Sequence, residues 1–241
     1  MSIIRRPAAE RGREKISWLD SRHSFSFANY YDPAHMGFRK LRVINDDRVG
    51  PNSGFGTHGH RDMEIISYVV DGALTHEDTT GAQGIIRRGD VQAMSAGTGV
   101  RHSEFNASKS DPVRFLQIWV MPTKAGLPAA YRQAHFSDES KHNTLRLLIE
   151  SESADAIGDG SDGGALGINQ DLRLYGSILD AGSKVSHSLA AGRGAWVQVV
   201  DGDITVNGQR LESGDGAAVE DIASVEIDAT AKSEFLLFDL A

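Results

Sequence analysis

The chain has 241 residues, of which 40% are hydrophobic, so it can bury a core in one large domain or two small ones. Its 33 acidic residues outnumber 25 lysines and arginines, and the net charge of -8 would repel phosphate backbones and anionic lipid surfaces. Cysteine is absent, which excludes disulfides, thiolate nucleophiles and cysteine-bound metals. We therefore expect no direct nucleic-acid partner, and any metal must be bound by histidine, carboxylate or water.

The N-terminal segment Met1–Lys15 contains arginines but lacks the apolar core of a secretory signal. No stretch approaches the roughly 20 apolar residues that a membrane span requires. These two observations predict a cytoplasmic protein that makes no contact with membranes.

Short apolar runs that end at glycine-containing turns dominate the chain. Residues 65–70 form such a run before the hairpin at Asp71-Gly72, and another run follows Gly89-Asp90. Only the segment Ala129–Phe136 has the pattern of a helix, and it is short. The runs predict an all-β fold made of barrels or sandwiches.

The second half of the chain repeats the pattern of the first. Residues 196–200 end at a second hairpin glycine, Gly202, which lies 130 residues after Gly72. Between the two copies lies an acidic connection near 151–170 that is rich in glycine and serine. We therefore expect two similar β-domains, residues 1–138 and residues 139–241.

Two pairs of metal-binding side chains stand out in the first copy. His58 and His60 are at positions i and i+2, which place both imidazoles on the same face of a strand, roughly 6–7 Å apart along the backbone. His102 and Glu104 have the same spacing. Two such pairs on facing strands predict one site with four ligands. Glu64 ranks below Glu104 as a ligand, because extended strand would separate it from His60 by roughly 13 Å.

The internal repeat provides a control for this interpretation. The offsets of the first pair from its hairpin glycine lead to Ser188 and Ala190 in the second copy. The offsets of the second pair lead to Ile227 and Ala229. None of these four residues binds metal well, so we expect one metal ion per chain, in the first domain.

The same segments carry a family resemblance, which covers most of the N-terminal half. The chain resembles the cupin superfamily and, more closely, bacterial pirin-like proteins of the quercetin 2,3-dioxygenase type. The matching segments are residues 23–33 (HSFSFANYYDP), residues 41–47 (LRVINDD), residues 58–61 (HGHR) and residues 102–104 (HSE). The resemblance implies a bicupin, with two β-barrel domains of the double-stranded β-helix (jelly-roll) type in tandem. It also implies that the second domain lacks metal ligands.

In pirins the metal ligands fall on the positions occupied here by His58, His60, His102 and Glu104, which is the set already indicated by spacing. The resemblance aligns Glu64 with the cupin glutamate, a ligand in many cupins but not in typical pirins. We interpret Glu64 as a buried charge that a neighbour such as Arg61 or Arg101 neutralises.

The resemblance implies an activity as well: cleavage of a flavonol such as quercetin by O2, with release of carbon monoxide. By analogy we expect iron, although the donor set also suits manganese, nickel, cobalt, copper or zinc. Glu104 would be the catalytic base that takes the proton of the 3-hydroxyl group. The alternatives are a metal-binding interaction module or a cupin enzyme for another small aromatic substrate. A monomer is the expected state.

Other side chains could line the site, but a structural role is the simpler interpretation. The aromatic cluster is expected to form core and interdomain packing rather than a ligand wall. Its members are Phe25, Phe27, Tyr30, Tyr31 and Phe38. The remaining N-terminal histidines are interpreted as hydrogen-bonded or partly exposed. They are His23, His35 and His76.

Overall fold

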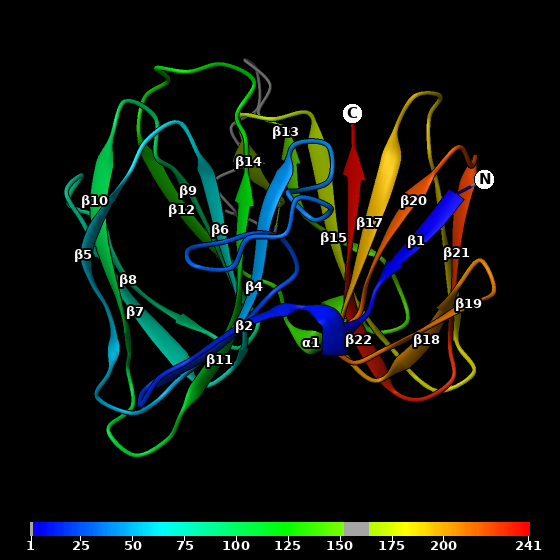
Figure 1. Cartoon of the computed structure of the whole chain (residues 1–241), viewed down its shortest axis with the longest axis horizontal. Helices are drawn as coiled ribbons and strands as arrows, with labels where there is room; N and C mark the ends of the chain where they lie inside the picture. The colour runs from blue at the N-terminus through cyan, green and yellow to red at the C-terminus, as the bar shows by residue number, and fades with distance from the viewer. Residues whose placement is uncertain (1, 152–163) are drawn as a thin grey trace. The chain divides into compact units, whose positions relative to one another are not determined.

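The computed structural model describes residues 2–151 and 164–241, which fold almost entirely into strands. They form two compact units (Figure 1). The N-terminal unit comprises Gly12–His135 together with the stretch that ends at Gln170. The C-terminal unit comprises Met1–Arg11, Phe136–Ser151 and Asp171–Ala241. The predicted connection near 151–170 falls largely on residues 152–163, which lie outside the described residues.

The N-terminal unit is built from two sheets. One has the strand order β12-β9-β6-β11-β4-β3-β2 and the other the order β5-β10-β7-β8. Their bounds are β2 (Gly12–Lys15), β3 (Leu19–His23), β4 (Leu41–Val49), β5 (Gly54–His60), β6 (Glu64–Asp71), β7 (Ala73–Asp78), β8 (Gln83–Arg87), β9 (Asp90–Ser95), β10 (Val100–Asn106), β11 (Val113–Val120) and β12 (Ala130–His135). A short strand, β14 (Leu166–Ile168), lies in the later stretch.

The C-terminal unit has the same two kinds of sheet. One contains β1-β20-β17-β22-β15-β13 in this order and the other β16-β21-β18-β19. The bounds are β1 (Ser2–Arg6), β13 (Arg146–Ser151), β15 (Leu172–Leu179), β16 (Lys184–Ser188), β17 (Gly194–Asp201), β18 (Asp203–Val206), β19 (Gln209–Glu212), β20 (Gly216–Glu220), β21 (Ser224–Ala229) and β22 (Ser233–Leu240). The 3-10 turn η1 (Ala8–Glu10) and the helix α1 (Asp138–Lys141) complete it.

The repeat expected from the sequence is present strand for strand. Strands β4, β5, β6, β9, β10 and β11 occupy the sheet positions of β15, β16, β17, β20, β21 and β22. The hairpin glycines correspond too: Gly72 and Gly202 both have positive φ, +77° and +99°, which explains why glycine is used at each turn. The all-β fold with two similar β-domains is therefore confirmed.

The strands of each barrel alternate buried and exposed side chains, so one face of each sheet forms the barrel interior. The pattern is clear in β21, where Val225, Ile227 and Ala229 are buried between more exposed neighbours. These three residues join a large apolar cluster that fills the C-terminal barrel. In the N-terminal barrel, smaller apolar clusters lie around Phe115 and around Met94. Buried polar side chains share this interior.

The expected helix at Ala129–Phe136 is wrong. Residues 130–135 form β12, an edge strand that pairs with β9 along its whole length, from Ala130 opposite Ser95 to His135 opposite Asp90. Pairing with a neighbouring strand satisfies the backbone groups of this segment and overrides its local preference for helix. The strand β1 holds the equivalent edge of the C-terminal unit.

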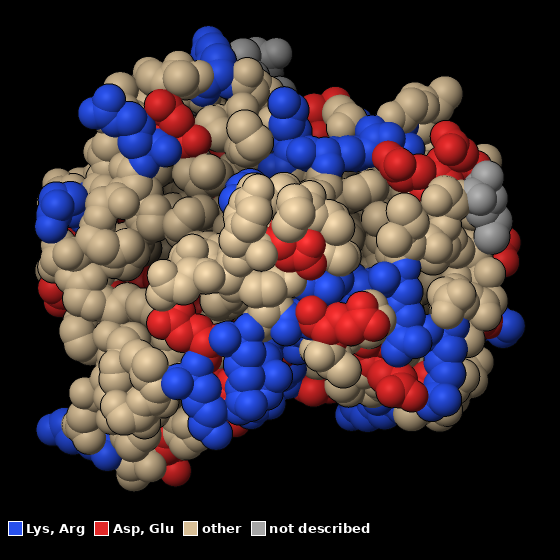
Figure 2. Space-filling model, viewed as in Figure 1, with Lys and Arg blue, Asp and Glu red and all other residues tan. Residues whose placement is uncertain are grey.

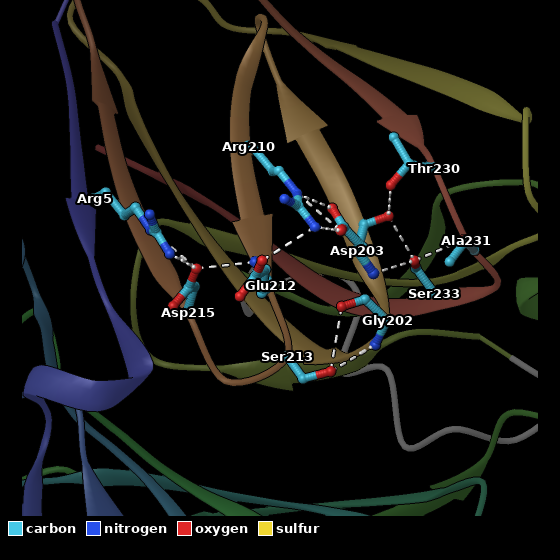
Figure 3. A network of polar contacts seen from close by, with 10 residues as sticks. All are labelled: Arg5, Gly202, Asp203, Arg210, Glu212, Ser213, Asp215, Thr230, Ala231 and Ser233. Atoms are coloured by element: carbon cyan, nitrogen blue, oxygen red, sulfur yellow. Dashed lines mark hydrogen bonds and ion pairs between the residues drawn. The ribbon is translucent and has the colours of Figure 1, made fainter.

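A buried aspartate attaches the first residues of the chain to the C-terminal unit (Figure 3). Asp215 accepts hydrogen bonds from the backbone N–H groups of Ala8 at 2.6 Å and Glu212 at 2.9 Å. Its Oδ2 atom also lies 2.7 Å from the Arg5 guanidinium. The side chain of Asp215 is only 2% exposed. These contacts explain why Met1–Arg11 belongs to the C-terminal unit, so the units are interleaved along the chain and do not meet at one boundary.

We expect Asp215→Ala to lower the free energy of unfolding of the C-terminal unit by roughly 2–4 kcal/mol, because it leaves two backbone donors and Arg5 without their acceptor. Arg210→Gln is the control, since the Arg210 side chain is 64% exposed and its ion pair with Asp203 is on the surface. Figure 2 shows basic and acidic side chains next to one another on the face in view. Chemical denaturation that finds equal losses for both variants would contradict the role of Asp215.

Candidate metal centre

The two predicted pairs lie on neighbouring strands of one sheet, not on facing strands. β5 and β10 are antiparallel, and His58 stands directly opposite His102 in their register. The register then shifts between His102 and Glu104, so that Glu104 is opposite Phe55. The extra residue is on β5, because β10 keeps an unbroken register with β7 and buries His102 and Glu104 on the same face.

Three imidazoles converge in the N-terminal barrel. The Nε2 atom of His102 lies 3.1 Å from Nε2 of His58 and 2.9 Å from Nε2 of His60. Two nitrogens bound at about 2.1 Å to one ion, at a right angle, would be about 3 Å apart. The distances are therefore those of three ligands on one face of a single metal ion.

Hydrogen bonds at the other ring nitrogens decide which atoms carry protons. Nδ1 of His58 lies 2.8 Å from the Gly56 carbonyl, which can only accept, so Nε2 of His58 bears a lone pair. Nε2 of His76 donates to Asp78 at 3.0 Å. Nδ1 of His76 then accepts from Nδ1 of His102, 3.4 Å away, and leaves Nε2 of His102 with a lone pair as well.

Lone pairs that point at one another are unfavourable unless a cation lies between them. Burial also lowers the pKa of His102 to about 3 and that of His60 to about 4, with a further contribution from the neighbouring imidazoles. Protons therefore do not compete for these two nitrogens at neutral pH. Donor type, distance and protonation all fit a divalent transition-metal ion.

Glu104 belongs to an overlapping group. One of its oxygens lies within 4.8 Å of ligand atoms of His76 and His102. Its carboxylate accepts hydrogen bonds from Ser67 at 3.2 Å and Gln117 at 2.8 Å. Complete burial raises the pKa of Glu104 to about 7. Residues of the opposite sheet thus hold Glu104 beside His76 and His102, and only His102 is common to this group and to the cluster of His58 and His60.

Glu64 is buried, but its partners differ from those expected. Its carboxylate accepts hydrogen bonds from Ser95 at 2.7 Å and Asn169 at 3.2 Å. Neither Arg61 nor Arg101 is a partner in the hydrogen bonds and ion pairs of the described residues. Asp62, with φ of +49°, bends the chain after β5, so that Glu64 starts a strand of the other sheet.

A cavity of about 90 Å³ opens between the two sheets of the N-terminal unit. His58 and Glu104 form part of its wall, together with the apolar side chains of Leu19, Phe27 and Phe55. Phe27, expected to be a packing residue, does pack edge-on against Trp119 with ring centroids 5.3 Å apart, but it also faces the cavity. Tyr31 of the same predicted cluster is 73% exposed.

Two protein-family models match this chain, one in each half. The family model for pirin matches residues 5–120, and the model described as the quercetinase C-terminal cupin domain matches residues 157–240. Quercetin 2,3-dioxygenase of Escherichia coli K12 is 43% identical over 99% of this chain and 98% of its own length. The pirin-like protein of Caulobacter vibrioides is 40% identical over 99% of this chain and 100% of its own.

The solved structure of the bacterial pirin YhhW of Escherichia coli, in complex with nickel(II), is 44% identical, with 99% of each chain covered and a TM-score of 0.90. The chain belongs to the pirin family. The resemblance stated from the sequence is confirmed. Within the described ranges, no helix of this family member is long and apolar enough to cross a membrane.

Sequence reasoning did not find a row of polar side chains that crosses the sheet opposite the histidines. The residues of this polar row stand directly opposite one another on β3, β4, β11, β6 and β9. They are His23, Asn45, Gln117, Ser67 and Gln92, all buried. One sequence pattern could have indicated this row: polar side chains occur at alternate positions of strands that are otherwise apolar.

The polar row supports the metal centre from behind. Ser67 and Gln117 bind Glu104, while Nε2 of Gln92 lies 3.4 Å from Nδ1 of His76. In the C-terminal barrel the equivalents of Gln117, Ser67 and Gln92 are apolar. They are Leu237, Val197 and Ala217. The strand that corresponds to β10 turns Val225, Ile227 and Ala229 inward.

Replacing His76 with phenylalanine should weaken metal binding by about 10–100-fold, because His102 loses the partner that fixes its tautomer. Titration with nickel or cobalt, followed by absorption spectroscopy, measures the change. His135→Phe is the matched control: His135 also binds an aspartate, Asp90, at 2.7 Å, but its side chain is 62% exposed. Equal affinities of both variants would contradict the supporting role of His76.

Asp47, on the cavity wall, should make stability depend on pH. Burial raises its pKa to about 7, whereas the unfolded chain has the ordinary value of about 4. Between these values the unfolded state loses its proton first, so stability falls as pH rises. Asp47→Asn should therefore leave stability unchanged near pH 4 and raise it by roughly 2–4 kcal/mol above pH 7. Urea denaturation of metal-free protein at both pH values tests this, and a difference that does not grow with pH would refute it.

Proposed function

We propose that this chain is a metal-dependent dioxygenase that cleaves flavonols such as quercetin with O2. The proposed metal ligands are His58, His60, His102 and Glu104. The observation that carries the proposal is the convergence of three imidazole nitrogens beside a buried acid, at the wall of a cavity. The 43% identity to a quercetin 2,3-dioxygenase along nearly the whole chain supports the choice of reaction.

Glu104 is suited to be the base. Burial raises the pKa of Glu104 to about 7 in the metal-free chain, so the carboxyl group can take up and return a proton while it is partly detached from the metal. We assign it the proton of the flavonol 3-hydroxyl group. Ser67 and Gln117 keep its carboxyl group oriented toward the histidines. Leu19, Phe27 and Phe55 present apolar surface to a flat aromatic ring.

A divalent metal, when bound, would supply Lewis-acid and redox chemistry to the flavonol and O2. One flavonol and one O2 give one depside and one carbon monoxide, so the atoms balance without another reductant. Iron was expected by analogy, but the related YhhW structure holds nickel(II), so nickel stands beside iron as a candidate for this chain. We retain a cytoplasmic monomer as part of the proposal.

The test is loss of the visible absorption of quercetin under air, on protein whose metal content has been measured. The wild type should turn over quercetin, and the His58→Ala, His102→Ala double variant should not, because it lacks two of the three converging nitrogens. Glu104→Gln should retain most of the metal but lose at least about 100-fold in rate, as expected for a catalytic base.

Circular dichroism must show that the variants remain folded. Full activity of Glu104→Gln would remove the base assignment alone. Bound metal without any turnover by the wild type would overturn the flavonol dioxygenase and would favour another small aromatic substrate or a metal-binding interaction module.

A further inference from the structure

The cavity beside the histidines has a polar wall opposite the metal-binding side. Asn45 and Asp47 are on β4, two residues apart, so both side chains face the cavity. The intervening residue, Asp46, turns to the other face, where it pairs with Arg114 at 2.9 Å. Strand alternation thus places Asn45 and Asp47 on the cavity face of β4 and Asp46 on the opposite face.

These two side chains hold acceptor atoms that no described residue satisfies. Oδ1 of Asp47 and Oδ1 of Asn45 have no hydrogen-bond partner within residues 2–151 and 164–241, although the residues are only 3% and 2% exposed. Ser21 hydrogen-bonds to the Asp47 carboxyl group but leaves its Oδ1 unpaired. A buried polar atom without a partner is costly, so both atoms point to a ligand that donates hydrogen bonds.

The donor on the same wall completes the pattern. Trp119 also lines the cavity, and its Nε1 atom is buried without an acceptor among the described residues. The cavity thus offers two acceptors and one donor between apolar walls. A hydroxylated aromatic ring has the complementary groups, because each phenolic hydroxyl can donate one hydrogen bond and accept another.

The repeat shows that the acceptor pair is specific to one barrel. Tyr175 and Ser177 occupy the positions of Asn45 and Asp47 in the C-terminal unit, as their pairing with Leu237 and Phe235 indicates. In that barrel Val225 and Ile227 replace His102 and Glu104, and His187, at the position of His58, is paired with Asp239 at 2.8 Å. The amide and carboxyl acceptors therefore occur together with the histidines.

We propose that Asn45 and Asp47 form a specificity wall, which accepts hydrogen bonds from ring hydroxyl groups of the aromatic substrate. The inference rests on the proposed function for the class of substrate and adds how that substrate is selected. The cavity of about 90 Å³ is smaller than the 300–1,000 Å³ usual for whole drug-sized ligands. It encloses no more than one ring, which places that ring against the wall and the rest of the molecule toward the opening.

The experiment compares the binding of quercetin with that of 3-hydroxyflavone, which retains the 3-hydroxyl and ketone groups but lacks the other hydroxyls. Dissociation constants are measured by calorimetry on the metal-loaded full chain without oxygen, so that no turnover occurs. Wild type should bind quercetin at least about ten-fold more tightly. Asn45→Leu and Asp47→Leu should each remove most of this preference by weakening quercetin alone.

Asp47→Asn keeps one acceptor oxygen in the same shape and should retain more of the preference than Asp47→Leu. Asp20→Asn is the control, because Asp20 is on β3 next to Ser21 but is not a lining residue of the cavity. It should leave both dissociation constants unchanged. Thermal unfolding and metal content verify that each variant is folded and loaded.

The outcomes separate this inference from the proposed function. Equal affinity of the wild type for both flavonols, or a preference that survives both leucine substitutions, overturns the specificity wall even if quercetin is turned over. A preference that depends on Asn45 and Asp47 supports the wall even if no turnover is found, and it would then assign a different hydroxylated aromatic substrate to the cavity.

Discussion

The convergence of three imidazole nitrogens at about 3 Å is the constraint on which the N-terminal barrel depends. Such a cluster of unprotonated nitrogens is unfavourable without a cation, and each ring must be kept in the right tautomer. The Gly56 carbonyl does this for His58, and the chain from His102 through His76 to Asp78 does it for His102. A metal site of this kind therefore requires a buried polar environment around it.

That requirement explains why the two barrels differ inside although their strands correspond. The polar row of the N-terminal barrel holds Glu104 and His76 and shares the interior with apolar clusters around Phe115 and Met94. The C-terminal barrel has leucine, valine and alanine at the equivalent positions and one large apolar cluster. One copy of the fold has space and polar groups for chemistry, and the other has a packed core that contributes stability.

Strand alternation determines where each of these groups points. On β4 it directs Asn45 and Asp47 to the cavity and Asp46 to Arg114 on the other face. On β10 it directs both His102 and Glu104 to the barrel interior, where Glu104 meets Ser67 and Gln117. Alternation thus gives neighbouring positions of one strand different surroundings.

The sequence by itself determined the all-β class, the repeat and the histidine pairs, because these depend on local signals: turn glycines, strand periodicity and i, i+2 spacing. It also indicated the family through short motifs. Only the tertiary structure decided that residues 130–135 form an edge strand, that Glu64 binds Ser95 and Asn169, and that Met1–Arg11 joins the C-terminal unit. The polar row and the support of His102 by His76 also emerged only there. All of these depend on contacts between residues far apart in the chain, and no local pattern encodes which distant strand will be the neighbour.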